Sequence, residues 1–238
     1  MTEEKEIKIQ LFENKDVREI RAKLSQQLRW SKTVVQSDHY YDDADFLFTK
    51  RDRGLRIRFV GGNPIDFTCK ALFYIPERKP SPWYVEEHVF KLPTKERDAI
   101  RKIFERFNLQ FDLINASITY ADVDMHLRKN NLSPKLIIEK KREVFVYEDA
   151  QVILDEVKDL GIFMEIETKT SSPMEIAKKL DLLKYGARTI EGYTTLLSRK
   201  LGLAEMKQKE PLYVENPTWN VFPKEKEIYG ALISQIVK

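Results

Sequence analysis

The chain has 238 residues, 42% hydrophobic and 33% charged, which is enough for one large domain or two small ones and too apolar for disorder. Its 41 lysines and arginines nearly balance 38 aspartates and glutamates, and a net charge of +3 argues against a nucleic-acid coat protein. One cysteine and three scattered histidines exclude an internal disulfide and show no Cys/His metal motif. Without a membrane-spanning apolar run or a signal-like start, the sequence predicts a soluble cytoplasmic protein that binds neither nucleic acid nor membranes.

The first strand is expected in the stretch EKEIKIQL, residues 4–11, where charged and apolar residues alternate. One face carries Glu4, Glu6 and Lys8, and the other carries Ile7, Ile9 and Leu11. Strict alternation over four to eight residues is typical of a half-buried strand. Taken alone, the charged face predicts a solvated surface, because charged side chains usually meet water.

The rest of the chain predicts a mainly antiparallel sheet with helices. Helices are expected over residues 14–28, from Thr94, from Ser172 and over residues 191–203. Strands are expected from Ser37 and over residues 55–60, 65–74, 83–92, 135–147, 152–157 and 162–170. Short turns such as GGNP favour hairpins. Seven or more strands with helices after the first, fourth and last indicate a closed antiparallel barrel with helices outside.

Charged residues share one parity in most of these strands, while the opposite parity is mainly apolar and can pack against the helices. The charged set is Glu4, Glu6, Lys8, Arg56, Arg58, Lys70, Lys140, Arg142, Asp155, Glu165, Glu167 and Lys169. A barrel interior admits one parity of each strand, so these side chains face either water or a shared lumen. A lumen of mixed charge suits a polyanion held by Lys and Arg, with divalent cations held by carboxylates.

Several stretches together carry a family resemblance. EKEIK matches an ExExK signature, GLRIR looks like a small–Leu–Arg–x–Arg segment with Gly54 where Ala is common, and EKKRE matches a Lys-x-Arg strand. LDEVKDLGIFMEIE is close to an Asp-containing strand, a Leu-Gly turn and a Glu-x-Glu strand. Over roughly residues 3–200 the chain resembles the CYTH proteins, or triphosphate tunnel metalloenzymes, which include class IV adenylate cyclases, thiamine triphosphatases and inorganic triphosphatases. The resemblance implies an α+β fold built on a closed eight-stranded antiparallel β-barrel, the tunnel, with helices packed outside.

The resemblance also implies roles for the charged residues. Metal ligands for Mg²⁺ or Mn²⁺ would be Glu4, Glu6, Glu165 and Glu167, and phosphates would be bound by Lys8, Arg56, Arg58, Lys70, Lys140 and Arg142. Lys8, Arg58 and Asp155 are the expected catalytic residues, with Asp155 either a second metal ligand or a residue that orients a base. In WYVEEHVF, either Glu86 or Glu87 faces the tunnel, and we favour Glu87 as a further metal ligand.

The implied chemistry is in-line attack on a phosphorus atom. Attack by water makes the protein a metal-dependent hydrolase of inorganic triphosphate, a nucleoside triphosphate or thiamine triphosphate, which is the function we expect. Attack by the ribose 3′-hydroxyl of ATP would instead make a class IV adenylate cyclase that yields cyclic AMP and pyrophosphate. The competing class is a non-catalytic nucleotide- or polyphosphate-binding module. The presence of both acids and bases on the strands argues against it, because a module that only binds would need the bases alone.

Two segments are expected along the chain: a tunnel domain over residues 1–202 and a C-terminal extension over residues 203–238. The extension is proline-broken and ends in an apolar stripe at helical spacing, Ile228, Leu232 and Ile236. A short helix gains most of its stability from packing, so the extension docks on its own barrel, docks on a second subunit or stays disordered, and docking is the outcome that we expect. The sequence therefore leaves a homodimer as one of the possible assemblies. Residues 109–134 are longer than a loop of the family needs to be.

Overall fold

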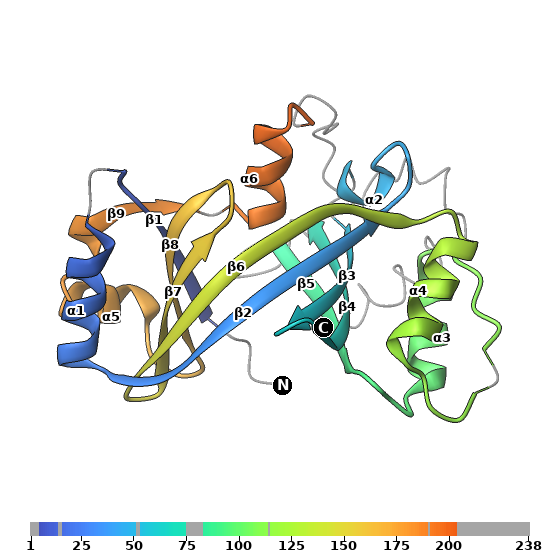
Figure 1. Cartoon of the computed structure of the whole chain (residues 1–238), viewed down its shortest axis with the longest axis horizontal. Helices are drawn as coiled ribbons and strands as arrows, with labels where there is room; N and C mark the ends of the chain where they lie inside the picture. Colours follow the sequence, from blue (N-terminus) through green and yellow to red (C-terminus); the bar gives the residue numbers. More distant parts are fainter. Residues whose placement is uncertain are drawn as a thin grey trace. The chain divides into compact units, whose positions relative to one another are not determined.

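The structure is a computed structural model, and it describes residues 5–13, 16–50, 53–74, 83–113, 115–189 and 191–203. Its strands are β1 (Lys5–Leu11), β2 (Arg29–Asp42), β3 (Arg53–Val60), β4 (Asn63–Tyr74), β5 (Trp83–Lys91), β6 (Ser133–Tyr147), β7 (Ala150–Val157), β8 (Gly161–Thr168) and β9 (Gly186–Thr189). Its helices are α1 (Val17–Gln27), α2 (Leu47–Lys50), α3 (Arg97–Arg106), α4 (Tyr120–Lys129), α5 (Pro173–Lys179) and α6 (Tyr193–Lys200), with a 3₁₀ turn at Leu183–Tyr185 (Figure 1).

The expected α+β class with a large antiparallel sheet is confirmed, but the closed eight-stranded barrel is wrong. The described strands form one nine-stranded sheet in the order β5-β4-β3-β2-β6-β7-β8-β1-β9, which does not close on itself. The reason lies in β1, which pairs antiparallel with β8 along one edge and with β9 along the other. Lys8 has Glu165 opposite on β8 and Thr189 opposite on β9, so β1 has no free edge there.

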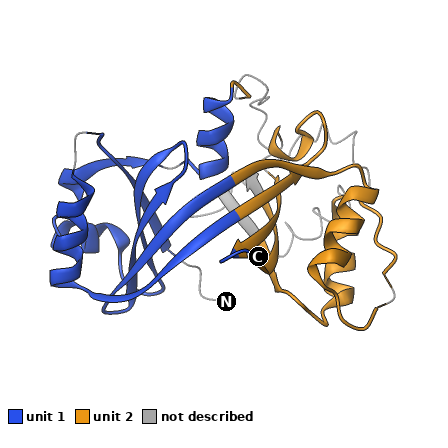
Figure 2. Ribbon diagram, viewed as in Figure 1, with its two compact units in different colours: residues 1–37, 60–62, 138–201 blue, residues 38–59, 63–137, 202–238 orange. Residues whose placement is uncertain are grey.

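The chain divides into two compact units, shown in different colours in Figure 2. Unit 1 comprises residues 1–37, 60–62 and 138–201, and unit 2 comprises residues 38–59, 63–137 and 202–238. The long strands β2 and β6 each contribute residues to both units. Each unit has a separate hydrophobic core.

The core of unit 1 lies between its strands and the helices α1 and α5, which lie side by side in Figure 1. Ile7 and Ile9 on β1 are buried, as the alternation in the sequence predicts. Helix α1 contributes Ile20 and Leu24, both with no exposed surface. The apolar parity of the strands therefore packs against the helices, and this leaves the charged parity on the opposite face.

Helix α5 begins where the sequence indicates. The Ser172 side chain accepts a hydrogen bond from the backbone N–H of Glu175, and Pro173 occupies the first helical turn, where its missing N–H costs nothing. Helix α1 is capped in the same way by Asp16, whose carboxylate accepts from the backbone N–H of Arg18 at 2.8 Å. Fixed helix starts keep the buried face of each helix in register with the sheet.

The core of unit 2 combines β3 and β4 with the helices α3 and α4. The helix expected after Thr94 is confirmed as α3, whose apolar residues Ile100, Ile103 and Phe104 are buried. Helix α4 lies inside the stretch interpreted as a long loop, and a capping box between Thr119 and Asp122 fixes its start. That Thr-x-x-Asp spacing was the available signal.

Three further elements differ from the sequence-based expectation. Strand β2 starts at Arg29 instead of near Ser37, and its first five residues are exposed, so they carry no alternating burial signal. The short α2 and β9 were not expected, because four residues are too few to show a period. Residues 204–238, most of the expected C-terminal extension, lie outside the described residues.

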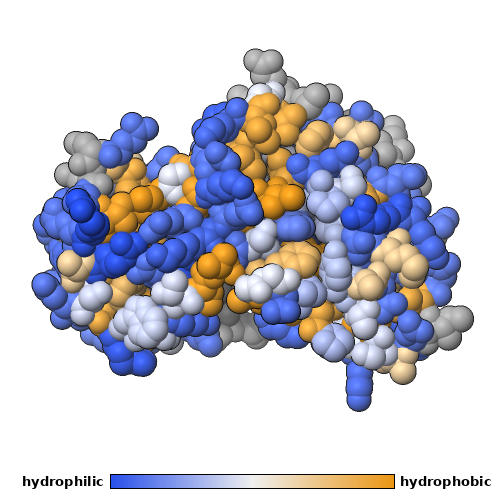
Figure 3. Space-filling model, in the orientation of Figure 1, coloured by the Kyte–Doolittle hydropathy of each residue, from blue (hydrophilic) through white to orange (hydrophobic). Residues whose placement is uncertain are grey.

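Hydrophilic side chains cover much of the surface in Figure 3, with apolar residues between them. The three most exposed of the described large apolar side chains are Val35 at 66%, Leu201 at 57% and Trp30 at 54%, and Val35 and Trp30 both lie on β2. No helix among the described residues is long and apolar enough to cross a membrane.

We predict that Gly186→Ala destabilises the protein by about 1–3 kcal/mol, the usual cost of overpacking. A Cβ at Gly186 would clash with the backbone oxygen of Gln10 and lie 2.8 Å from Ile9 Cγ2, which pushes β9 away from β1. Chemical denaturation measures the loss. Gly54→Ala is the control, because its Cβ would meet only the ring of Tyr40 at 3.7 Å. Equal stability of the two variants would contradict the prediction.

Candidate functional site

Charged residues from four strands of unit 1 and one tyrosine from a helix converge on the face of the sheet opposite α1 and α5. This acid–base cluster consists of Lys8 on β1, Lys140 and Arg142 on β6, Asp155 on β7, Glu165 on β8 and Tyr193 on α6. The strand registers bring them together, since Arg142 lies opposite Asp155 and Lys8 lies opposite Glu165. Cross-strand neighbours of this kind lie within side-chain reach.

Asp155 is the centre of the acid–base cluster and has no exposed surface. Arg142 donates to both carboxylate oxygens, from Nε to Oδ1 at 2.8 Å and from Nη2 to Oδ2 at 2.6 Å. Lys140 Nζ and the hydroxyl of Tyr193 donate to Oδ2 at 3.2 Å and 3.0 Å. A buried carboxylate is costly unless it is paired and hydrogen-bonded, and these donors supply both conditions.

Glu165 is the second buried acid of the cluster, 5% exposed. Arg142 Nη2 donates to its Oε2 at 2.5 Å, and Lys8 Nζ lies 3.1 Å from its Oε1. Arg142 thus joins Asp155 and Glu165 through one guanidinium. The planar fork of arginine suits such bridging, because its N–H groups point in fixed directions.

The cluster holds its acids ionised and its phenol neutral. Burial alone would raise the pKa of Asp155, but hydrogen bonding by Arg142 and the charge of Lys140 outweigh burial and lower it. The pKa of Glu165 is also lowered, because Lys8 and Arg142 outweigh the effect of burial. Burial and the two nearby carboxylates raise the pKa of Tyr193. Asp155 and Glu165 are therefore acceptors and Tyr193 is a donor across the neutral pH range.

Two more carboxylates border the cluster at the β1–β8 pair. Glu6 lies directly opposite Glu167 in the strand register. Their side chains are 48% and 21% exposed, with Lys8 Nζ 3.6 Å from Glu6 and Arg142 Nη1 3.9 Å from Glu167. Like charges directly opposite on a strand pair repel, and a divalent cation between them removes that repulsion.

The residues present fit a hard divalent cation in their chemistry, since oxygen ligands suit Mg²⁺ and Mn²⁺. Glu6 and Glu167 are the accessible pair, and Glu165 already accepts from two cations. The expected ligand Glu4 lies outside the described residues. In the described part of the chain, no three acids, histidines or cysteines are grouped closely enough to form a complete metal site.

A second cluster lies in unit 2 and contains Asp38 on β2, Arg56 and Arg58 on β3, and Asp66 and Thr68 on β4. Arg58 binds Asp38 through two parallel hydrogen bonds, Nε to Oδ1 at 2.7 Å and Nη2 to Oδ2 at 2.8 Å. Arg56 Nη2 donates to Thr68 Oγ1 at 2.7 Å and lies 3.5 Å from Asp66 Oδ1. Asp38 and Asp66 are buried, at 3% and 2% exposure.

The remaining candidates lie away from these contacts. Lys70 on β4 and Glu87 on β5 face each other in the register, and both are exposed. The side chain of Glu86 lies outside the described part of the structure. Lys169 is exposed beyond the end of β8.

Sequence reasoning missed the two acids of the unit 2 cluster. Asp66 and Thr68 have the same strand parity as Lys70, so the polar alternation was visible in the sequence. Asp38 has the parity of the buried Gln36, but the strand was expected to start only at Ser37, so this alternation was not followed. No spacing in the sequence links Tyr193 to Asp155, to which its hydroxyl donates.

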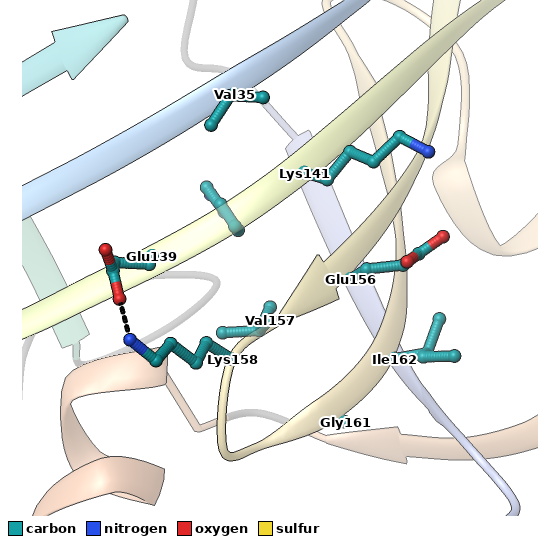
Figure 4. A pocket seen from close by; sticks show the side chains of 9 residues that line it. Val35, Glu139, Lys141, Glu156, Val157, Lys158, Gly161 and Ile162 are labelled. Atoms are coloured by element: carbon teal, nitrogen blue, oxygen red, sulfur yellow. Dashed lines mark hydrogen bonds and ion pairs between the residues drawn. The ribbon is translucent and has the colours of Figure 1, made fainter. Parts of the chain in front are cut away.

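A separate hollow of about 380 Å³ lies on unit 1, lined by β2, β6, β7 and β8 (Figure 4). Glu139 and Lys158 pair with each other on one side of it, and Lys141 and Glu156 lie on the other side in Figure 4. Its charged groups have protein partners, such as Arg21 for Glu156 at 2.5 Å. The hollow therefore resembles a solvated, paired surface more than a ligand site.

Comparison with known proteins identifies the family. The model of the CYTH domain family matches residues 2–190. The chain belongs to the CYTH domain family. A Methanocaldococcus jannaschii protein named "putative adenylate cyclase" is 27% identical over 182 residues, which are 75% of this chain and 83% of that protein.

Solved structures of other CYTH-like proteins share the fold. A protein of Pyrococcus horikoshii OT3 is 22% identical with a TM-score of 0.54, over 83% of this chain and 99% of that chain. A Hippeastrum protein, described as a "putative adenylyl cyclase" with a dominant triphosphatase activity, is 21% identical with a TM-score of 0.52. That similarity covers 84% of this chain and 96% of the Hippeastrum chain.

We predict that acid unfolds this CYTH protein partly through Asp155 and Glu165. Their lowered pKa values mean that the stability they contribute is fully present above the ordinary carboxyl pKa of about 4 and is lost as the pH falls through the folded-state values. Asp155→Asn should cost roughly 3 kcal/mol or more at neutral pH, because buried cations lose their partner. Its stability should then fall less steeply below about pH 4 than that of the wild type. Parallel denaturation curves across this range would contradict the assignment.

We also predict that Arg58→Ala costs roughly 3 kcal/mol of stability, because buried Asp38 loses its bidentate partner. In the double variant with Asp38→Asn, the combined loss should be smaller than the sum of the two single losses by about 1 kcal/mol or more. Urea denaturation of the four proteins measures the coupling. Strictly additive losses would show that the pair contributes nothing as a pair.

Proposed function

We propose that this CYTH protein is a divalent-metal-dependent triphosphatase. The observation that carries the proposal is the acid–base cluster of unit 1, where Lys8, Lys140 and Arg142 share one face with Asp155 and Glu165. Lysine and arginine side chains fixed side by side are the groups that bind adjacent phosphates. The substrate is inorganic triphosphate, a nucleoside triphosphate or thiamine triphosphate, since these share the same polyanionic group.

The charge of this face supports metal dependence. Its three cations meet four carboxylates, the buried Asp155 and Glu165 and the more exposed Glu6 and Glu167. A bare triphosphate therefore meets no net positive charge there. A Mg²⁺ or Mn²⁺ ion held by Glu6 and Glu167, with Glu165 and Glu4 as the further expected ligands, would offset the carboxylate charge and polarise the phosphate oxygens.

The chain's own residues have separable tasks in this mechanism. Lys8, Lys140 and Arg142 bind phosphate oxygens and stabilise the negative charge that builds up on the transferred group. Asp155, which already accepts four hydrogen bonds, orients Lys140 and Arg142 and is kept from serving as a proton acceptor. Of the two roles that the sequence left open for Asp155, orientation of bases is the one that this geometry favours.

The proposal also assigns phosphate binding to Arg56, Arg58 and Lys70 of unit 2. Arg56 and Arg58 are each oriented by a buried acid, and their side chains are 13% and 22% exposed. Lys70 is exposed and therefore free to move toward an anion. Glu87 is exposed as well, and it is the weakest of the proposed metal ligands.

Adenylate cyclase activity is the alternative, favoured by the name of the Methanocaldococcus jannaschii relative. The same residues would bind the triphosphate of ATP, and only the nucleophile would differ. Hydrolysis is the simpler reaction, because it requires no pocket for adenine. The Hippeastrum protein, which has this fold, is called a putative adenylyl cyclase and is described with a dominant triphosphatase activity.

The test is incubation with tripolyphosphate, ATP or thiamine triphosphate, with Mg²⁺, with Mn²⁺ or with neither. Release of orthophosphate supports the triphosphatase, and cyclic AMP with pyrophosphate supports the cyclase. Binding of tripolyphosphate without turnover of any substrate would instead support a non-catalytic module. Arg142→Gln, which removes the charge that bridges both buried acids, should abolish most activity.

We predict that excess chelator abolishes turnover and that added Mg²⁺ or Mn²⁺ restores it. Glu6→Gln should raise the metal concentration needed for half-maximal activity roughly ten-fold, the effect of losing about 1.4 kcal/mol of a charged contact. Glu139→Gln is the matched control, since this carboxylate of unit 1 pairs with Lys158 at the surface. Full activity in chelator, or equal metal dependence of the two variants, would remove Glu6 from the metal site.

A further inference from the structure

Tyr193 is the first residue of α6 and lies three positions beyond the segment that matches the family. It is buried, at 9% exposure, although its phenol carries a polar group. Gly192 precedes it in extended conformation as the N-cap residue of the helix. Helix α6 therefore delivers one aromatic side chain to a cluster that is otherwise built from strands.

The ring of Tyr193 lies beside two of the three cations of the cluster. Lys8 Nζ lies 4.4 Å from the ring centroid, and Lys140 Nζ lies 4.9 Å from it. A cation within about 6 Å of an aromatic face is attracted by the ring quadrupole, and more strongly where water is excluded. One ring thus holds two ammonium groups that would otherwise repel each other.

The hydroxyl of Tyr193 makes a third connection. It donates to Asp155 Oδ2 at 3.0 Å, the same oxygen that accepts from Lys140. Phe163, which has no exposed surface, packs edge-on against the ring at 5.0 Å and 72° and limits its rotation. Ring and hydroxyl are therefore fixed by independent contacts.

We propose that Tyr193 is a positioning residue that holds the ammonium groups of Lys8 and Lys140 in the arrangement that binds a triphosphate. The inference rests on the function proposed above. A lysine side chain has four rotatable bonds, and its ammonium is a point charge without fixed direction. The ring restricts both ammonium groups in addition to their carboxylate partners, which are Glu165 for Lys8 and Asp155 for Lys140.

The ring and the hydroxyl are separated by substitution. Tyr193→Phe keeps the ring and removes only one of four donors to Asp155, so its Kd for tripolyphosphate should stay within about threefold of the wild type. Tyr193→Leu and Tyr193→Met fill the space without a ring face and should weaken binding about tenfold or more. In turnover assays the two ring-free variants should raise KM more than they lower kcat, because the ring acts on substrate binding.

Calorimetric titration of the Mg²⁺-loaded full chain with tripolyphosphate measures the Kd without requiring turnover. Leu197→Ala is the matched control, since Leu197 lies on the same helix and is also 9% exposed. This variant should lower the melting temperature and leave the Kd unchanged, which is the result expected for a residue that only helps to dock the helix. Two ring-free variants are included so that the test can still be made if one of them does not fold.

The outcomes separate the two proposals. A wild type that binds tripolyphosphate but hydrolyses no triphosphate overturns the proposed triphosphatase, and the Kd series still tests Tyr193. Unchanged Kd in Tyr193→Leu or Tyr193→Met overturns the positioning role. A loss in Tyr193→Phe as large as in the ring-free variants also overturns it, because the hydroxyl would then be the decisive group. A wild type that binds no tripolyphosphate overturns the inference outright.

Discussion

The buried ion pair between Arg142 and Asp155 is the interaction on which the candidate site of unit 1 depends. Asp155 has no exposed surface, so its charge is tolerated only because three side chains donate to it. The pair also specifies the register of β6 against β7, since Arg142 and Asp155 are directly opposite. A slip of one residue would turn every side chain of the strand to the other face and place a charge in the hydrophobic core.

The alternation of the strands explains how one sheet can serve both stability and chemistry. In β1, Ile7 and Ile9 pack under α1 and α5, while Lys8 between them points to Glu165 on the opposite face. Because the helices cover the apolar face, the charged face is free to be organised by charge alone. The unit 2 cluster follows the same logic, with Ile57 in the core and Arg56 and Arg58 beside buried acids.

The sequence predicts those features that local period controls. The buried parity of β1, the stripe of α3 and the start of α5 at Pro173 all follow from spacing within one segment. Pairing between distant segments is not encoded that way. Closure of the sheet was predicted wrongly because β9, only four residues long, takes the second edge of β1. Likewise, the contacts of Asp38 and Tyr193 depend on registers and helix positions that one strand cannot reveal.

The composition of the acid–base cluster also bears on why it exists. Replacing buried ion pairs by apolar residues is often neutral or stabilising, so stability is a weak reason for burying Asp155, Glu165, Arg142 and Lys140. Unit 1 also contains a carboxylate outside the acid–base cluster, Asp149, whose hydrogen bonds can be compared with those of Asp155. Asp149, in the exposed turn after β6, accepts from the neutral hydroxyls of Thr168 and Ser171 and needs no buried cation. The concentration of cations and acids on this one face supports the proposal that the face binds a charged ligand.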